Sequence, residues 1–494
     1  MRLSAADVLQ SHSLEGVEPA EAPCPLANAP MSERSITPTA WLYLAVYLLT
    51  LLDAVFPMPI VAGAAAFGLM AFVVTQLPAI RMPQRIASAL LIAGGVAAAW
   101  SRGGVQGALA DLLAGAERAL PFMVLFAAVM CLQVPALVSP SFRQLGERVV
   151  AQPPGRRFLM LAFAGHYLGA VLNLAGLQLV ASLLDPEMRP RLRRRLTLAV
   201  LRGFSAAVMW SPFFVGMGVI LTVVPGVSWL QLAPVGLVIG SGLVLLAWAL
   251  DRATRGPRDP QSDPESDSQS KRGAVPAGNL ARAALGVLAV FLALAVPVVA
   301  LSEGAGLSIV IALGLTAPSL SVLWAGLLRR TGSADPAPVL ASVTARLPGL
   351  RNEAALFLAA TVFAVGVSHA VDADTLAGSL GLADWPPGLK LAALALMGTL
   401  LGGLGVHPVV LAILVGEVLG PAALGLSPLA VALLLAVVWG MGTQMSPFSA
   451  TVMHVARLLD VSVFRVAWRW NAPYCLPAAA LAGAAVAGVA TLIG

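Results

Sequence analysis

Charged residues are scarce in this 494-residue chain, at 11% of the composition, while apolar residues make up 59%. Soluble domains carry roughly 25% charged and 45–50% apolar residues, so these values exclude an ordinary water-soluble protein. The mean hydropathy of +0.87 comes from separate apolar runs, each about 17–25 residues long and sufficient to cross a bilayer core of roughly 30 Å as a helix. The composition therefore predicts an all-α polytopic membrane protein.

Cysteine is also rare, and the common catalytic motifs are missing. Cys24, Cys131 and Cys475 lie in different segments without paired spacing, which excludes a disulfide framework and gives no support for a zinc site. The sequence has no Gly-x-x-x-x-Gly-Lys-Ser/Thr, no His-Glu-x-x-His and no Gly-x-Ser-x-Gly. An ATP-driven pump would need a separate subunit, and we expect neither an enzyme nor a bound cofactor or metal.

The 30 basic residues exceed the 24 acidic ones, but they fall in short loops rather than in a patch that would bind nucleic acid. In such loops basic residues indicate the cytoplasmic side. Residues 1–38 are polar and predict a disordered cytoplasmic tail, and the helix at 39–57 acts as the insertion signal. These features are typical of a multi-pass protein of a bacterial inner membrane.

Eleven spans and two irregular apolar stretches organise the chain. The stretches at 158–184 and 389–420 contain Gly, Asn, His or Pro in mid-run, so we interpret them as re-entrant hairpins. A polar segment at 251–278 predicts a cytoplasmic linker. The spans are expected near 40–56, 58–78, 86–100, 119–139, 198–224, 229–250, 279–301, 304–328, 354–371, 427–456 and 473–493.

The halves on either side of the linker, 58–250 and 279–494, match each other. Matching motifs lie 233–236 residues apart and in the same order. They are Glu117 with Glu353, Pro-Pro-Gly at 153–155 with 386–388, Gly165 and Gly169 with Gly398 and Gly402, and Ser-Pro-Phe at 211–213 with 446–448. The last pair falls within the spans 198–224 and 427–456, and we expect its prolines to break both helices.

Loop charge predicts that the two halves have opposite orientations. Five arginines between 189 and 195 follow the first hairpin, whereas the equivalent stretch at 420–427 has no charge. The bias is reversed after the broken helices, where 225–230 is uncharged but Arg457, Arg465 and Arg469 follow the second. With basic loops in the cytoplasm, the first hairpin enters from inside and the second from outside, and the C-terminus is extracytoplasmic.

This arrangement of a leading helix and two inverted copies, each with a hairpin and a broken span, resembles the ion transporter superfamily. The closest likeness is to divalent anion/sodium symporters and to arsenite, citrate and C4-dicarboxylate permeases. Those symporters carry Ser-Asn-Thr at each hairpin tip, whereas this chain reads VLNLAG at 171–176 and GVHP at 405–408. The resemblance implies a homodimer with an elevator mechanism, in which hairpins and broken helices move against a fixed scaffold.

Candidate binding residues lie at the predicted breaks and tips. Inverted repeats place their sites near the bilayer midplane, where half-helix ends face the solute. We expect solute or ion contacts from the following residues: Asn173, Ser211, Pro212, His407, Thr443, Gln444, Ser446, Pro447 and Ser449. A structural proline kink and a packed histidine remain open alternatives. His166 and Glu417 are possible proton or ion relays, and an inert interfacial carboxylate is the alternative for Glu417.

The sequence thus predicts a secondary active transporter for a small anion, with organic acids the leading class, coupled to Na⁺ or H⁺. The expected partners are the anionic solute, the lipid bilayer and a second copy of the chain. One alternative is a permease subunit that depends on an extracytoplasmic binding protein. A membrane-embedded enzyme is the other.

Overall fold

The computed structural model describes residues 36–185, 187–254, 277–370, 372–379, 381 and 385–493, and every regular element in these ranges is a helix. The protein is an all-helical polytopic membrane protein. Residues 1–35 of the predicted tail and 255–276 of the predicted linker lie outside the described ranges.

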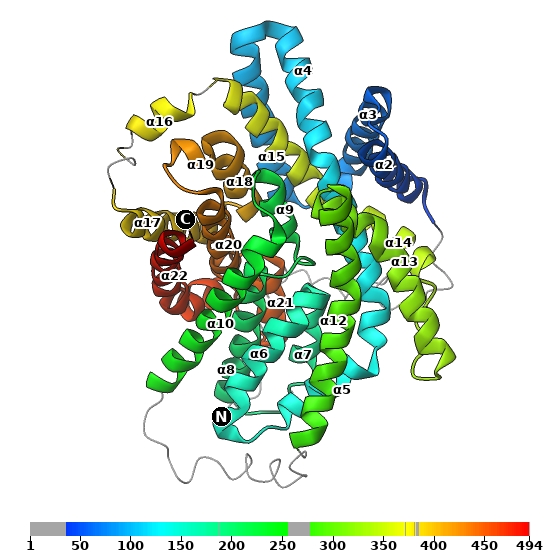
Figure 1. Cartoon of the computed structure of the whole chain (residues 1–494), viewed down its shortest axis with the longest axis vertical. Helices are drawn as coiled ribbons and strands as arrows, with labels where there is room; N and C mark the ends of the chain where they lie inside the picture. The colour runs from blue at the N-terminus through cyan, green and yellow to red at the C-terminus, as the bar shows by residue number, and fades with distance from the viewer. Residues whose placement is uncertain are drawn as a thin grey trace, which may run out of the picture.

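The chain starts with two antiparallel helices, α2 (Pro38–Val55) and α3 (Pro59–Gln76), followed by the short η2 (Leu77–Ala79). Next comes α4 (Met82–Val138), which reverses direction at Gly104 (φ 55°, ψ −142°) and forms a hairpin projecting from one end of the molecule (Figure 1). Its second arm begins well before the predicted span at 119. The extra turns include Asp111, whose charge lowers the local hydropathy and which pairs with Arg102 at 3.1 Å.

The rest of the first half contains a helical hairpin and an interrupted helix. After α5 (Pro140–Val150), the helices α6 (Pro154–Leu172) and α7 (Leu174–Ser182) meet at Asn173. The interrupted helix consists of α8 (Pro190–Ala206), η3 (Ala207–Met209) and α9 (Val215–Val223). The last helix is α10 (Trp229–Ala253), whose start is fixed by a capping box between Ser228 and Gln231.

The second half repeats this order. It comprises α12 (Ala277–Ala305), α13 (Ile309–Arg330), α14 (Val339–Arg346), η4 (Leu347–Leu350), α15 (Arg351–Ala370), α16 (Ala373–Ser379), α17 (Pro387–Gly403), α18 (Pro408–Ile413), the π-helix η6 (Leu414–Leu419), α19 (Gly420–Ala423), α20 (Pro428–Met445), α21 (Ala450–Leu458), the π-helix η7 (Arg465–Asn471) and α22 (Ala472–Ile493). The hairpin is now α17 to α19, and the interrupted helix is α20 and α21.

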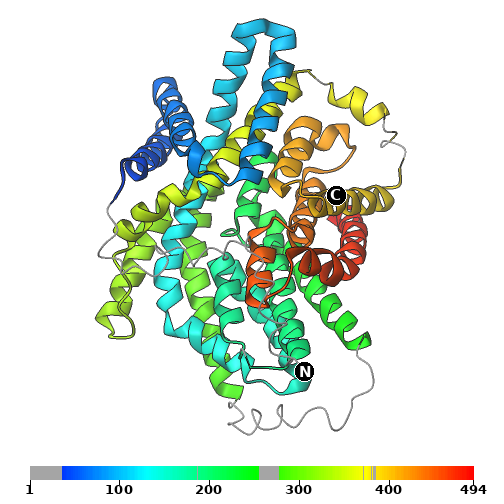
Figure 2. The ribbon, with the colours of Figure 1, turned by 180° about the vertical axis from the view of Figure 1, so that it is seen from behind.

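Nine helices in the described ranges are long and apolar enough to cross a membrane. They account for ten of the predicted spans because α4 contains two, and the eleventh, 198–224, is divided among α8, η3 and α9. The interrupted helix at 428–458 lies at the centre, with 89% of its apolar stretch buried, against 22% for 284–305 at the periphery. Seen from behind, the orange and red helices of the second half lie beside the green helices of the first (Figure 2).

Glycines allow each hairpin to approach its own interrupted helix closely. Gly203 on α8 faces the Ala162 backbone on α6, and a Cβ there would lie 2.6 Å from the Ala162 carbonyl carbon. In the second half, a Cβ on Gly402 of α17 would lie 2.8 Å from the Cα of Gly442 on α20. Small residues at such positions allow backbone-to-backbone packing of membrane helices. Both hairpins therefore pack in the same way on the helix that follows them.

The acidic segment at α16 and the helix ends that flank residues 255–276 lie at opposite ends of the molecule. Helix α16 lies toward the end with the α4 turn, whereas the linker ends of α10 and α12 lie at the other end (Figures 1 and 2). Beside α16, hydrogen bonds from the hydroxyl and the backbone amide of Thr375 hold the pKa of the Asp372 carboxyl below its usual range. This carboxyl is therefore ionised at neutral pH.

Candidate functional site

Two interruptions of the helical backbone form the centre of the candidate site. Residues 210–214 separate η3 from α9, and residues 446–449 separate α20 from α21. Pro212 and Pro447 lie inside these interruptions, where a missing amide hydrogen prevents the helix from continuing. Ser211, Ser446 and Ser449 lie there as well.

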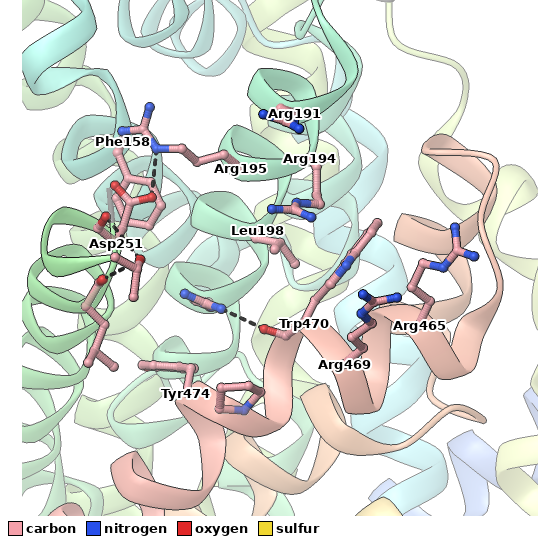
Figure 3. A pocket seen from close by; sticks show the side chains of 14 residues that line it. Phe158, Arg191, Arg194, Arg195, Leu198, Asp251, Arg465, Arg469, Trp470 and Tyr474 are labelled. Carbon is pink, nitrogen blue, oxygen red and sulfur yellow. Dashed lines mark hydrogen bonds and ion pairs between the residues drawn. The ribbon is translucent and has the colours of Figure 1, made fainter. Parts of the chain in front are cut away.

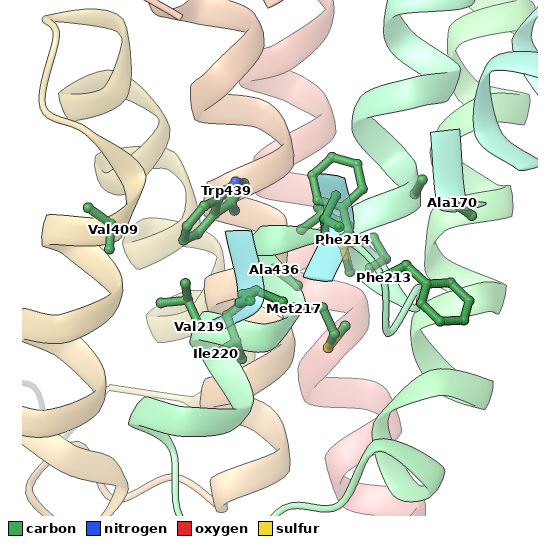
Figure 4. Close-up of a cluster of buried hydrophobic side chains, with 14 of the residues drawn as sticks. Ala170, Phe213, Phe214, Met217, Val219, Ile220, Val409, Ala436 and Trp439 are labelled. Carbon is green, nitrogen blue, oxygen red and sulfur yellow. The ribbon is translucent and has the colours of Figure 1, made fainter. Parts of the chain in front are cut away.

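The interrupted helices of the two halves pack directly on each other, since α20 contacts α8, η3 and α9. A Cβ on Gly216 of α9 would lie 2.7 Å from the indole of Trp439, and one on Gly440 would lie 2.7 Å from the Ser205 carbonyl oxygen. Figure 4 shows Trp439 and Ala436 of α20 facing the α9 residues Met217 and Ile220 across this contact. Residues more than 200 positions apart thus meet in one buried region.

Each hairpin also contacts the interrupted helix of the other half. Helix α18, the returning arm of the second hairpin, packs on α9, and α7, the returning arm of the first, packs on α21. The relation is reciprocal. As a result, both hairpin tips lie next to the interruptions, and Asn173 and His407 come from opposite halves of the chain.

His407 presents a free ring nitrogen at the second tip. Its Nδ1 accepts a hydrogen bond from the Val409 amide at 3.2 Å and caps α18. The neutral ring therefore carries its proton on Nε2, for which no partner is recorded in the described part of the chain. The side chain is exposed, and its ring centroid lies 6.3 Å from that of Trp439. Nε2 can thus donate to a solute.

Asn173 occupies the first tip in a strained backbone conformation, with φ 54° and ψ −139°. Few residues other than glycine adopt such angles, which cost of order 1–3 kcal/mol and often occur at functional sites. Its side chain is half-buried and makes no capping bond to α7. The amide group can therefore face a ligand at the tip.

The helices that begin at the tips and interruptions differ in their caps. His407 caps α18 and Ser449 caps α21, whereas α7 and α9 have no side-chain cap. The first amides of a helix lack internal partners and carry partial positive charge. The uncapped starts of α7 and α9 are therefore suited to an anionic group.

The end of α20 supplies polar groups of a different kind. Thr443 donates to the Trp439 carbonyl at 2.9 Å, and Gln444 donates through Nε2 to the Gly440 carbonyl at 3.2 Å. Gln444 is completely buried, yet its Oε1 has no hydrogen-bond partner in the ranges that the structure describes. A buried orphan acceptor is costly, so this oxygen is a candidate ligand for a cation or a donor group.

Three predicted site residues are engaged elsewhere. Ser211 donates to the Ala170 carbonyl at 2.5 Å and ties the first interruption to α6. His166 is completely buried, its Nδ1 lies 3.2 Å from the Gly203 carbonyl, and its Nε2 accepts from the Trp210 indole at 2.9 Å. Glu417 pairs with Arg118 of α4 at 3.2 Å. A relay through His166 would have to break both of its contacts.

Sequence reasoning missed an arginine-lined pocket of about 780 Å³ between the first and second halves (Figure 3). It interpreted these basic residues only as markers of topology. The signal was present in the spacing, because Arg191, Arg194, Arg195, Leu198 and Arg202 recur at three- and four-residue intervals and so share one face of α8.

No protein-family model matches the sequence, and a search of curated proteins found no match. Among solved structures, the chain is similar to the YdaH transporter of Alcanivorax borkumensis, a protein described as having an unusual topology. The two are 16% identical, the match covers 78% of this chain and 89% of that chain, and the TM-score is 0.49.

Proposed function

We propose that this protein is a secondary active transporter for a small anion, with organic acids the leading class, and that it works by an elevator-type mechanism. The carrying observation is the reciprocal contact of each hairpin with the interrupted helix of the other half. Interrupted helices inside a membrane protein are tolerated where they line a binding site, and in transporters built from inverted repeats they hold the solute.

An anion is the favoured solute because the available groups are donors. The uncapped starts of α7 and α9 provide amides with partial positive charge. His407 adds an Nε2–H, and Asn173 adds an amide NH₂. A carboxylate could accept from several of these groups at once.

The coupling ion would bind on the α20 side. Gln444 Oε1 is a buried oxygen without a partner, and the interruption at 446–449 frees carbonyls that can serve as ligands for Na⁺. Proton coupling through His407 is the alternative, since the reference pKa of histidine, about 6.5, lets small changes of environment switch its charge.

An elevator movement would carry the hairpins and interrupted helices together past α4 and α15. The Arg118–Glu417 pair joins α4 to the second hairpin, so in this proposal it breaks during transport. The inverted topology, the extracytoplasmic C-terminus and a homodimer belong to the same proposal. The Ser211 and His166 bonds would keep the first hairpin and α8 together as they move.

Reconstitution into proteoliposomes tests the proposal. We expect saturable uptake of small carboxylates that depends on a Na⁺ or proton gradient, without ATP and without an added binding protein. Dependence on an added binding protein would favour the permease subunit instead, and a chemically altered product would establish an enzyme.

Three variants test the site within this assay. His407→Ala, Asn173→Gly and Ser446→Ala should each reduce uptake at unchanged expression, and only His407→Ala should also lose stability, about 1 kcal/mol, because His407 caps α18. His369→Ala is the matched control, because this half-exposed histidine pairs with Asp111 away from the interruptions. Wild-type uptake in all three variants would remove the site assignment.

A further inference from the structure

The arginine-lined pocket brings together cations from distant parts of the chain. Arg191, Arg194, Arg195 and Arg202 come from α8, and Arg465 and Arg469 come from η7. Figure 3 shows the labelled arginines of α8 and η7 around one hollow, together with Trp470, Tyr474 and Phe158. Among the described residues that line it, the only carboxylate is that of Asp251, at the end of α10.

Most of this positive charge is not neutralised by ion pairs within the described ranges of the chain. Asp251 pairs with Arg195 at 2.7 Å. Arg202 is held by the Trp470 carbonyl at 3.0 Å and lies 4.6 Å from the centroid of the Tyr474 ring, while Arg194 lies 5.1 Å from that of Trp470. These aromatic and carbonyl contacts orient the cations but cancel no charge.

One arginine also has an unused donor. The Nη2 of Arg195 is buried and has no hydrogen-bond partner among the described residues, although Nε of the same side chain bonds Asp251. A buried guanidinium nitrogen without an acceptor is unfavourable. An anionic oxygen in the pocket would satisfy it and would lower the repulsion among the arginines.

We propose that this pocket binds a phosphate-bearing anion with at least two negative charges. Planar guanidinium groups form paired hydrogen bonds with phosphate oxygens. The volume of about 780 Å³ is far larger than one phosphate needs and fits a diphosphate compound or the headgroup of an anionic phospholipid.

The bound anion would contact both halves of the chain and hold them together, because α8 and α10 belong to the first half and η7 and α22 to the second. It would therefore raise the stability of the folded protein in proportion to its occupancy. This inference is independent of the transport proposal, since neither interruption nor hairpin tip lines the pocket.

Thermal unfolding of the purified full chain tests the proposal. The probes are detergent micelles mixed with phosphatidylcholine, with or without cardiolipin, and inorganic pyrophosphate in detergent alone. We expect at least one phosphate probe to raise the melting temperature by about 3 °C or more. Stabilisation by cardiolipin alone identifies a lipid site, and equal stabilisation by pyrophosphate identifies a soluble ligand.

The triple variant Arg191→Gln, Arg465→Gln, Arg469→Gln should lose this stabilisation, with binding at least about tenfold weaker. The matched control replaces Arg143, Arg282 and Arg330, which are exposed on other elements, and should respond like the wild type. If the triple variant does not fold, Arg465→Gln alone should show a reduced response. An unresponsive wild type, or an Arg465→Gln variant that responds fully, would overturn the proposal.

Discussion

Replacing Gly203 by alanine should destabilise the protein by separating α6 from α8. The new Cβ would overlap the Ala162 carbonyl oxygen, its nearest neighbour, and would lie 2.6 Å from the carbonyl carbon, whereas non-bonded carbons prefer about 3.5–4.0 Å. Because the overlap with the oxygen is the larger one, the helices would have to move apart by more than about 1 Å. Overpacking of this kind costs about 1–3 kcal/mol.

The same movement would weaken the hydrogen bond between the His166 ring and the Gly203 carbonyl, now 3.2 Å long, at a further cost of about 0.5–1.5 kcal/mol. Alanine recovers about 1 kcal/mol through its higher helix propensity. The expected net loss is therefore about 1–3 kcal/mol.

The assay is thermal unfolding in detergent, with Gly242→Ala on α10 as the control. No atom lies within 4 Å of a Cβ at Gly242, so this variant should gain up to about 1 kcal/mol from helix propensity alone. The two variants should therefore shift the melting temperature in opposite directions. A Gly203→Ala protein that melts with the wild type would refute the close approach of α6 and α8.

Three further predictions concern the tips, the interruptions and the contact with α4. Asn173→Gly should melt at or above the wild-type temperature, whereas Asn173→Ala should melt below it and lose about 1 kcal/mol in free energy of unfolding, because only glycine adopts φ 54° freely. Equal melting temperatures of the two variants would contradict the backbone strain at Asn173. Ser211→Ala should lower the free energy of unfolding by about 1–3 kcal/mol, because it leaves the buried Ala170 carbonyl without its hydrogen bond. Ser446→Ala should change the free energy of unfolding by less than about 0.5 kcal/mol but should reduce uptake. Glu417→Gln should change stability by less than about 1 kcal/mol because Arg118 is half-exposed, but it should alter the uptake rate. The double variant Arg118→Glu, Glu417→Arg should restore the wild-type rate. Identical uptake rates in all forms would exclude the ion pair from a role in transport.

The helical fold was predictable from the sequence because each crossing helix satisfies its own backbone hydrogen bonds, so its position depends mainly on local hydropathy. The π-helices η6 and η7 were not predictable, since both arise within apolar or mixed runs that would serve equally well as α-helices. The early start of the second α4 arm was missed for a related reason: Asp111 lowers the hydropathy, and its partner Arg102 is identified only once the hairpin has closed.

The candidate site was predictable in part. The prolines of the two Ser-Pro-Phe motifs indicated the interruptions, because a proline removes a backbone donor wherever it occurs. The different roles of the two serines could not be foreseen. Ser211 bonds to a carbonyl of the first hairpin, whereas no partner of the Ser446 hydroxyl is recorded in the described part of the chain, and identical motifs carry no information about their neighbours.

Sequence alone determined which segments are apolar enough to cross a membrane and where proline prevents a helix from continuing, since both properties depend on residues that are adjacent along the chain. Only the tertiary structure decided that His166 is engaged at both nitrogens, that the imidazole of His407 keeps a free one, and that arginines from α8 and η7 share a pocket. Such partners lie tens to hundreds of residues away, and their contacts depend on how the helices pack.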